Sequence, residues 1–253
     1  MSRTAVVTEA RACLPPDLCA LHSVRTVEPL GADPAPWADL LSEVLPKADG
    51  VLCLTSAGTL SASHQGALEA VRQLQDTPAG AINVLDTGTT GIGLGLMALE
   101  AARLAQQGAS LQEVAARCQQ LRVRVQTLGI LETLDPLVAS GRVPEAARWQ
   151  QQLGTAYTGV FLLEMGRIEL LSTVHSRERS LERMARQITA RCQLAPVHAG
   201  AMYTTSADEA DRLAELLAAR VNLVEFYNVP MHPRLAQVAG PGALAIGFYP
   251  SAS

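Results

Sequence analysis

Short apolar runs alternate with longer stretches of helical periodicity through the first half of the chain. The runs have the length of buried strands, and they cover residues 5–7, 50–54 and 81–85. The helical stretches follow the second and third runs, and they cover residues 60–75, 93–107 and 111–125. Ser110 and Glu113 have the spacing of a capping box before the last of these helices. This alternation predicts a parallel sheet covered by helices on both faces.

The pattern changes after Leu134, where Asp135-Pro136 and Ser140-Gly141 interrupt it. Runs at 157–164 and 168–174 flank Met165-Gly166-Arg167 and predict a β-hairpin. Further helices are expected over 178–192 and 206–220, and further strands over 196–203, 223–229 and 243–248. We therefore expect an α/β protein of two domains. A parallel-sheet α/β/α domain is predicted over residues 1–134, and a smaller α+β domain over residues 135–253.

The composition favours a folded protein with an aliphatic interior. Hydrophobic residues make up 48% of the chain and charged residues only 17%, which excludes a disordered protein. Because aromatic residues make up only 4%, any pocket must be lined mainly by aliphatic side chains, which suit a flexible aliphatic ligand. The net charge is −4, and the arginine-rich stretch 177–191 contains no aromatic residue. Nucleic acid is therefore not an expected partner.

The cysteines argue against both a disulfide framework and a zinc site. The five cysteines are odd in number, widely spaced and without a Cys-x-x-Cys pair, and Cys53 lies inside an apolar run as a core residue would. No apolar stretch approaches the length of a membrane span, and no signal-peptide pattern opens the chain. We expect a cytoplasmic protein with no transmembrane segment, no metal and no cofactor.

Two loops of small residues, 54–65 and 86–95, each connect an apolar run to a helix. Backbone N–H groups at such a junction, together with the helix dipole, favour an anion. The first loop carries Thr59, Ser61 and Ser63, and the second carries Thr87. The structural alternative is that the hydroxyls cap the following helix. The glycines at 91, 93 and 95 are expected to allow close packing, because Leu96 replaces the third glycine of a dinucleotide-binding motif.

Several segments, in order along the chain, resemble the DegV family. The first helix-start motif, Leu60-Ser61-Ala62-Ser63-His64-Gln65-Gly66-Ala67, is similar to the family's Leu-Ser-Gly-Thr-Tyr-Gln-x-Ala. Other segments correspond to the family's Thr-Asp-Ser…Asp-Leu-Pro, Val-x-Asp-Ser, Gly-Gly-Arg and Gly-Pro-Gly-Ala-Leu. They are Thr8-Glu9-Ala10 with Leu14-Pro15, Val84-Leu85-Asp86-Thr87, Gly141-Arg142 and Gly240-Pro241-Gly242-Ala243-Leu244.

The resemblance implies a two-domain protein that binds one fatty acid, with the tail inside and the carboxylate at the domain interface. Some members of the family present that carboxylate to the ATP-binding subunit of a fatty-acid kinase. The family's carboxylate ligands are a serine that matches Ser61, a threonine without a match here, and a histidine whose position holds Val238. Ser61 is thus the main ligand-binding candidate, followed by Thr59, Ser63 and Thr87. Arg142 and Arg177 are candidate partner contacts, and His232 is a candidate substitute for the histidine.

Three functions stay open at this point. The first is a non-catalytic protein that binds a long-chain fatty acid near Ser61. The second is an enzyme acting on a small phosphorylated or carboxylated metabolite, with Asp86 as its candidate base. The third is a DegV-like interaction module without lipid, suggested by the missing threonine and histidine, because a buried carboxylate with too few donors is costly.

Overall fold

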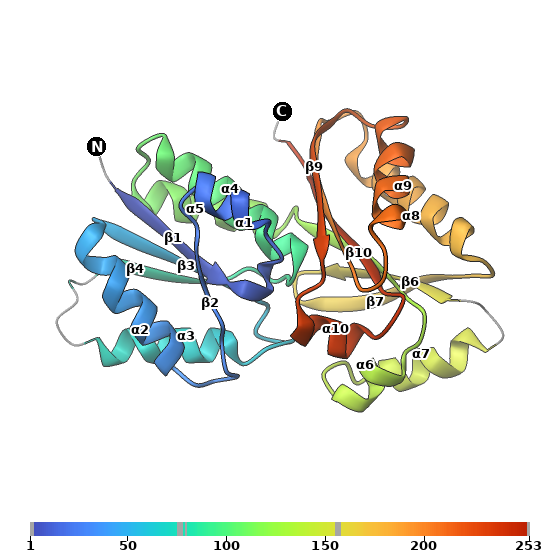
Figure 1. Cartoon of the computed structure of the whole chain (residues 1–253), viewed down its shortest axis with the longest axis horizontal. Coiled ribbons are helices and arrows are strands. Elements are labelled where there is room, and N and C mark those ends of the chain that lie inside the picture. The colour runs from blue at the N-terminus through green and yellow to red at the C-terminus, as the bar shows by residue number, and fades with distance from the viewer. Residues whose placement is uncertain (1–2, 75–77, 79, 155–157, 252–253) are drawn as a thin grey trace.

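The computed structural model describes residues 3–74, 78, 80–154 and 158–251 of the chain. Its strands form two sheets, one of four strands and one of six, which lie side by side along the long axis of the molecule (Figure 1). The predicted α/β fold, with a parallel first sheet and a mixed second part, is confirmed.

The first sheet has the strand order β2-β1-β3-β4, and all its neighbours are parallel. Its strands are β1 (Thr4–Glu9), β2 (Arg25–Val27), β3 (Gly50–Thr55) and β4 (Ile82–Asp86). The three predicted strands are those with continuous apolar runs. Strand β2 was not predicted, since it has only three residues and two of them are exposed.

Helices cover both faces of this sheet, as expected (Figure 1). Helices α2 and α3 pack on one face, and α4 and α5 pack on the other. The α-helices of this half are α1 (Pro16–Leu21), α2 (Ala35–Val44), α3 (Ser63–Gln73), α4 (Ile92–Gln106) and α5 (Leu111–Arg122). Two short 3-10 helices, η1 (Ala10–Ala12) and η2 (Leu45–Lys47), lie between them and the strands. The capping box of Ser110 and Glu113 is confirmed. Cys53 is buried in the core, and burial raises the pKa of its thiol to about 12.

Helix α3 begins later than the sequence predicted. The backbone N–H groups of Leu60 and Ser61 both donate to the carbonyl of Ala57, so these residues form a turn ahead of the helix. The helix starts at Ser63, and its predicted end at Gln75 lies outside the described residues. Ser61 therefore lies in the loop between β3 and α3, and not within a helix.

The second sheet has the strand order β7-β6-β5-β10-β8-β9. Its neighbours are antiparallel except for β8 and β9. The strands are β5 (Gln126–Leu131), β6 (Thr158–Glu164), β7 (Arg167–Val174), β8 (Val197–Tyr203), β9 (Leu223–Pro230) and β10 (Leu244–Pro250). The hairpin of β6 and β7 is confirmed, and both its turn residues, Met165 and Gly166, have positive φ. The predicted first residue, Tyr157, lies outside the described residues.

Strand β5 places a segment before Leu134 in the second sheet. It pairs with β6 on one side and with β10 on the other. The sequence predicted a helix to residue 125 and no strand after it, but helix α5 ends at Arg122. Sheet membership thus changes between Arg122 and Gln126, earlier than the expected boundary after residue 134. We propose that the two domains divide at this point, and the six-stranded sheet is the larger of the two.

Helices also cover both faces of the second sheet. Helices α8 and α9 pack on one face, while α6, α7 and α10 lie against the other (Figure 1). Their bounds are α6 (Asp135–Ser140), α7 (Ala146–Leu153), α8 (Arg177–Cys192), α9 (Ala207–Ala218) and α10 (Pro233–Ala239). The guanidinium of Arg177 holds both carboxylate oxygens of Glu209 and so joins α8 to α9. This candidate partner contact is therefore engaged inside its own domain.

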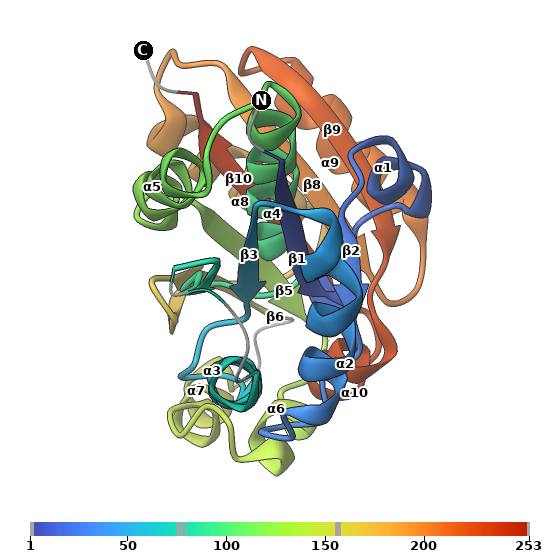
Figure 2. The same cartoon turned by 90° about the vertical axis from the view of Figure 1, so that its left-hand side faces the viewer.

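Helix α4 contacts both sheets, through β1 in the first and through β8 and β10 in the second (Figure 2). Glycines allow this close packing. A Cβ atom at Gly95 would collide with the carbonyl oxygen of Ala12, and one at Gly247 in β10 would lie 2.8 Å from the backbone nitrogen of Gly93. The expectation that the glycines of the second small-residue loop serve close packing is confirmed for Gly93 and Gly95.

A charged cluster joins α4 to the outer strands of the second sheet. Arg103 donates to both carboxylate oxygens of Glu225, at 2.8 and 2.5 Å, and Nδ1 of His198 lies 2.7 Å from Oε1 of the same carboxylate. Burial alone would raise the pKa of Glu225, but the hydrogen bonds from Arg103 and His198 outweigh it and lower that pKa to about 2. The ionised carboxylate therefore stabilises the contact between the two halves.

Replacing Glu225 should lower the stability at neutral pH and remove the part of the stability that the wild type loses in acid. A carboxylate with a lowered folded-state pKa stabilises the protein above its unfolded-state pKa, and this contribution is lost as the pH falls through the folded-state value. We expect Glu225→Gln to lower the free energy of unfolding by about 2 kcal/mol at pH 7, with the difference shrinking between about pH 4.5 and pH 2. Urea denaturation over a pH series measures it. Glu215→Gln, at an exposed ion pair, is the control, with an expected loss under about 1 kcal/mol.

A methyl group at Gly95 should separate helix α4 from η1. Alanine would gain up to about 1 kcal/mol from helix propensity, but forcing the Ala12 carbonyl away costs about 1–3 kcal/mol. We expect Gly95→Ala to destabilise the protein in urea denaturation. Gly129→Ala is the matched control, because its added Cβ would meet neighbours at 3.7 Å, an ordinary contact distance. Equal stability of the two variants would contradict this account of the packing.

Candidate functional site

A buried polar cluster lies where strands β1 and β3 end. Glu9, the last residue of β1, is fully buried. Its Oε1 accepts a hydrogen bond from the backbone N–H of Ser56 at 2.8 Å, and its Oε2 accepts one from the Ser56 hydroxyl at 2.7 Å. Nη2 of Arg11 lies 2.8 Å from Oε2 of Glu9 and donates to the hydroxyl oxygen of Ser61 at 3.0 Å. The parallel strands bring these residues to one edge of the sheet.

Ser61 and Ser63, two of the predicted ligand-binding residues, lie together in this cluster. The hydroxyl oxygen of Ser61 also accepts from the backbone N–H of Ser63 at 3.2 Å. The helix N-cap is Ala62, so Ser61 fixes the turn before the helix and is not the cap itself. Among the described residues, the fully buried hydroxyl of Ser63 has no hydrogen-bond partner.

Thr59 and Thr87, the other two predicted residues, make contacts elsewhere. The hydroxyl of Thr59 donates to the carbonyl of Gly166 at 2.6 Å and thereby joins the first domain to the hairpin turn of the second. The buried hydroxyl of Thr87 donates to the carbonyl of Thr55 at 2.8 Å, between the ends of two neighbouring strands. The structure does not place either hydroxyl with Ser61.

Asp86, the candidate base, holds the two small-residue loops together. Its Oδ1 accepts from the backbone N–H of Gly88 at 2.8 Å, and its Oδ2 accepts from the backbone N–H of Gly58 at 3.0 Å. Both carboxylate oxygens are thus hydrogen-bonded to the backbone. This arrangement supports a structural role for the side chain.

An apolar cavity of about 150 Å³ lies between the second sheet and helices α6 and α10. Its walls include Leu131, Phe161, Met202 and Val238, so the position expected for a histidine contributes an aliphatic wall. Thr90 lines the cavity, and its hydroxyl lies 3.0 Å from that of Ser56 in the polar cluster. The cavity therefore adjoins the cluster through Thr90.

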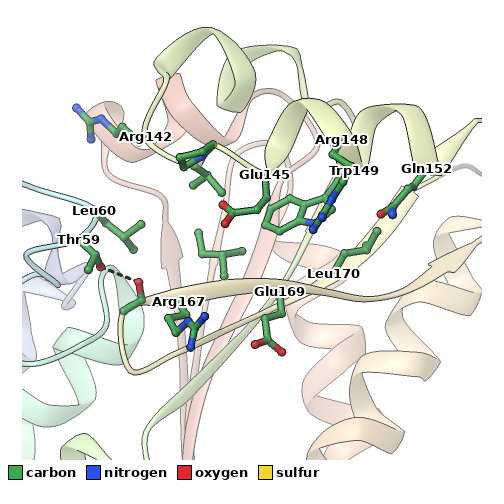
Figure 3. Close-up of a pocket in the computed structure, with 14 residues that line it drawn as sticks. Thr59, Leu60, Arg142, Glu145, Arg148, Trp149, Gln152, Arg167, Glu169 and Leu170 are labelled. Carbon is green, nitrogen blue, oxygen red and sulfur yellow. Dashed lines mark hydrogen bonds between the residues drawn. The ribbon is translucent and has the colours of Figure 1, made fainter.

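A second, open pocket of about 580 Å³ lies between α7 and strand β7 (Figure 3). Its lining includes three arginines, Arg142, Arg148 and Arg167. Thr59 and Leu60 form its edge on the side of the first domain (Figure 3). Leu60 also packs against residues that line the apolar cavity. The residue before Ser61 therefore lines the arginine-lined pocket and packs against the hydrophobic cluster that contains two cavity residues, Leu137 and Phe161.

His232 does not join the polar cluster. Its Nε2 lies 3.0 Å from a carboxylate oxygen of Glu28, and its Nδ1 accepts from the backbone N–H of Arg234 at the start of α10. The residues that sequence reasoning missed are Glu9 and Arg11. One signal for them exists in the sequence, since a buried strand ends in one charged residue and is closely followed by another, at the same sheet edge as the Ser61 loop.

The structure offers no metal site and no membrane-spanning helix in the part of the chain that it describes. Within residues 3–74, 78, 80–154 and 158–251, no three His, Cys, Asp or Glu side chains are grouped so that they could hold a metal ion. No helix in the same residues is both long and apolar enough to cross a membrane. All five cysteines are free thiols.

The fold and the site define a two-domain α/β protein with an apolar cavity beside a buried polar cluster. The chain belongs to the DegV family, since the model of that family, described as one of uncharacterised proteins, matches residues 30–251. A DegV domain-containing protein of Streptomyces coelicolor is 28% identical over 231 residues, which cover 90% of this chain and 80% of that protein. One from Deinococcus radiodurans is 27% identical over 223 residues, covering 86% and 76%.

Solved structures give the same result for the fold. A DegV family protein from Thermus thermophilus, described by its fatty acid binding, matches with a TM-score of 0.90 at 25% identity, covering 98% of this chain and 100% of that one. A DegV family protein from Corynebacterium glutamicum matches with a TM-score of 0.89 at 23% identity, covering 100% and 99%. The expected family and two-domain fold are confirmed.

Proposed function

We propose that this protein binds one long-chain fatty acid and does not alter it chemically. The observation that carries the proposal is an aliphatic cavity that meets the polar cluster at Thr90. An acyl chain has the chemistry of the cavity, and a carboxylate near Ser61 has the chemistry of the cluster. The fatty acid binding described for the Thermus thermophilus relative supports the same assignment.

Helix α10 is the element that must shift to seat a long acyl chain. The cavity measures about 150 Å³, whereas ligand pockets usually measure about 300–1,000 Å³. Leu235, Val238 and Ala239 of α10 form one wall of it, and no residue of this seven-residue helix is fully buried. Each methylene that the movement buries contributes about 0.8 kcal/mol to binding.

The side chains near the site support binding and not catalysis. Both oxygens of Asp86, the base that an enzyme would need, are occupied by backbone N–H groups. Burial raises the pKa of the Cys13 thiol to about 11, so it does not supply a thiolate at neutral pH. The free cysteines also support a reducing, cytoplasmic location.

The pocket between α7 and β7 is lined by three arginines and two glutamates, Glu145 and Glu169, and this excess of positive charge supports a partner that carries phosphate. Arg142, the candidate from the sequence, lines it together with Arg148 and Arg167. Arginine is well suited to bind phosphate oxygens. Because Leu60 borders this pocket and stands next to Ser61, a partner seated there would reach the bound carboxylate. We therefore assign this surface to the ATP-binding subunit of a fatty-acid kinase.

Removing the Ser61 hydroxyl should weaken lipid retention. Purified protein should release close to one equivalent of a long-chain fatty acid into organic solvent, measured by mass spectrometry. Losing a hydrogen bond to a charged group costs about 1.5–3 kcal/mol, so the Ser61→Ala variant should retain much less fatty acid than the wild type. Ser42→Ala, at an exposed serine of α2, is the control and should retain the wild-type amount. Folded wild-type protein that binds no added fatty acid would disprove the proposed function.

Filling the cavity from helix α10 should block the acyl chain without touching the polar cluster. Ala239 lines the cavity, whereas Gln237 on the same helix is exposed. We expect Ala239→Phe to weaken the binding of palmitic acid at least about tenfold by isothermal titration calorimetry, which corresponds to about 1.4 kcal/mol. Gln237→Phe should bind like the wild type. Equal affinities for the two variants would place the chain elsewhere.

A further inference from the structure

A buried arginine stands beside Ser61 with unused hydrogen-bonding capacity. Arg11 is only 6% exposed. Its guanidinium carries five N–H donors, and Nη2 serves both Glu9 and Ser61. Among the described residues, the buried Nε has no hydrogen-bond partner. A buried donor without an acceptor costs about 1–3 kcal/mol, and an acceptor on a bound ligand would remove this cost.

Ser63 provides a second observation of the same kind. Its fully buried hydroxyl also has no partner among the residues that the structure describes. Arg11 and Ser63 are both hydrogen-bonded to the Ser61 hydroxyl oxygen, the first through Nη2 and the second through its backbone N–H. Two unsatisfied donors thus flank one serine. A carboxylate, which accepts through two oxygens, matches them.

Glu9 holds the arginine in place and does not use up its charge. The Glu9 carboxylate also accepts two hydrogen bonds from Ser56, one from the backbone and one from the hydroxyl. These dipoles stabilise the buried anion together with Arg11. The guanidinium can therefore be shared between Glu9 and a second carboxylate. Val238, at the position expected for a histidine, presents an aliphatic side chain to the cavity and donates nothing.

We propose that Arg11 is the residue that selects a ligand with an anionic headgroup, and that Glu9 is its positioning residue. The inference rests on the proposed fatty-acid-binding function and adds how the site distinguishes an acid from an uncharged lipid.

The test compares two ligands of equal chain length, palmitic acid and 1-hexadecanol, on delipidated full-length protein by isothermal titration calorimetry. The wild type should bind the acid at least about tenfold more tightly than the alcohol. Arg11→Gln should reduce this preference to within about threefold, mainly by weakening the acid, and should change the alcohol little. Arg25→Gln, at a surface arginine paired with Glu43, is the control and should keep the full preference.

Arg11→Gln leaves the buried Glu9 carboxylate without its ion pair, which destabilises the fold. A second variant therefore tests the same claim without an unpaired buried charge. Glu9→Gln with Arg11→Gln removes both charges together, and it should bind the acid and the alcohol alike. A preference for the acid that survives in either folded variant overturns the role of Arg11. Equal affinities in the wild type overturn it too, while fatty acid binding stands. A wild type that binds neither ligand overturns the proposed function as well.

Discussion

The fully buried carboxylate of Glu9 sets the arrangement of the first sheet's carboxyl end. An ion removed from water costs several kcal/mol unless hydrogen bonds and an opposite charge surround it. In this protein those partners are Ser56, after strand β3, and Arg11, in the 3-10 helix after strand β1. The hydrogen bonds and the ion pair of this one carboxylate therefore fix two loops. The same arrangement brings Arg11 to Ser61, in the loop just before helix α3.

The site depends equally on how closely the two sheets approach. The polar cluster belongs to the first sheet and the apolar cavity to the second. Helix α4 packs against both, because Gly95 lies against the Ala12 carbonyl and Gly93 lies against Gly247 in β10. Thr90, just before this helix, contacts the cluster and lines the cavity. A ligand that is polar at one end and apolar along its length suits this junction.

Features with a local signal could be predicted from the sequence. The Ser110 capping box and the Met165-Gly166 hairpin turn are local patterns, and the structure has both. Strand β5 was missed because the helical periodicity of the preceding segment continues almost to its first residue. Its place in the second sheet is decided by pairing with β6 and β10, which are distant in the sequence. Ser61 was the main candidate because it stands at a strand-to-helix junction and matches the serine of the DegV motif. Arg11 was missed because it meets Ser61 only when β1 lies beside β3.

The central claim is that a fatty acid spans the two domains, with its carboxylate at the polar cluster and its chain in the apolar cavity. A crystal structure of the protein with bound palmitic acid tests this most directly. Our account predicts carboxylate oxygens within hydrogen-bonding distance of the Ser61 hydroxyl and the Arg11 guanidinium, and a chain that runs past Thr90 between Phe161 and Val238. A carboxylate that faces solvent away from Ser61, or a chain outside this cavity, would contradict it.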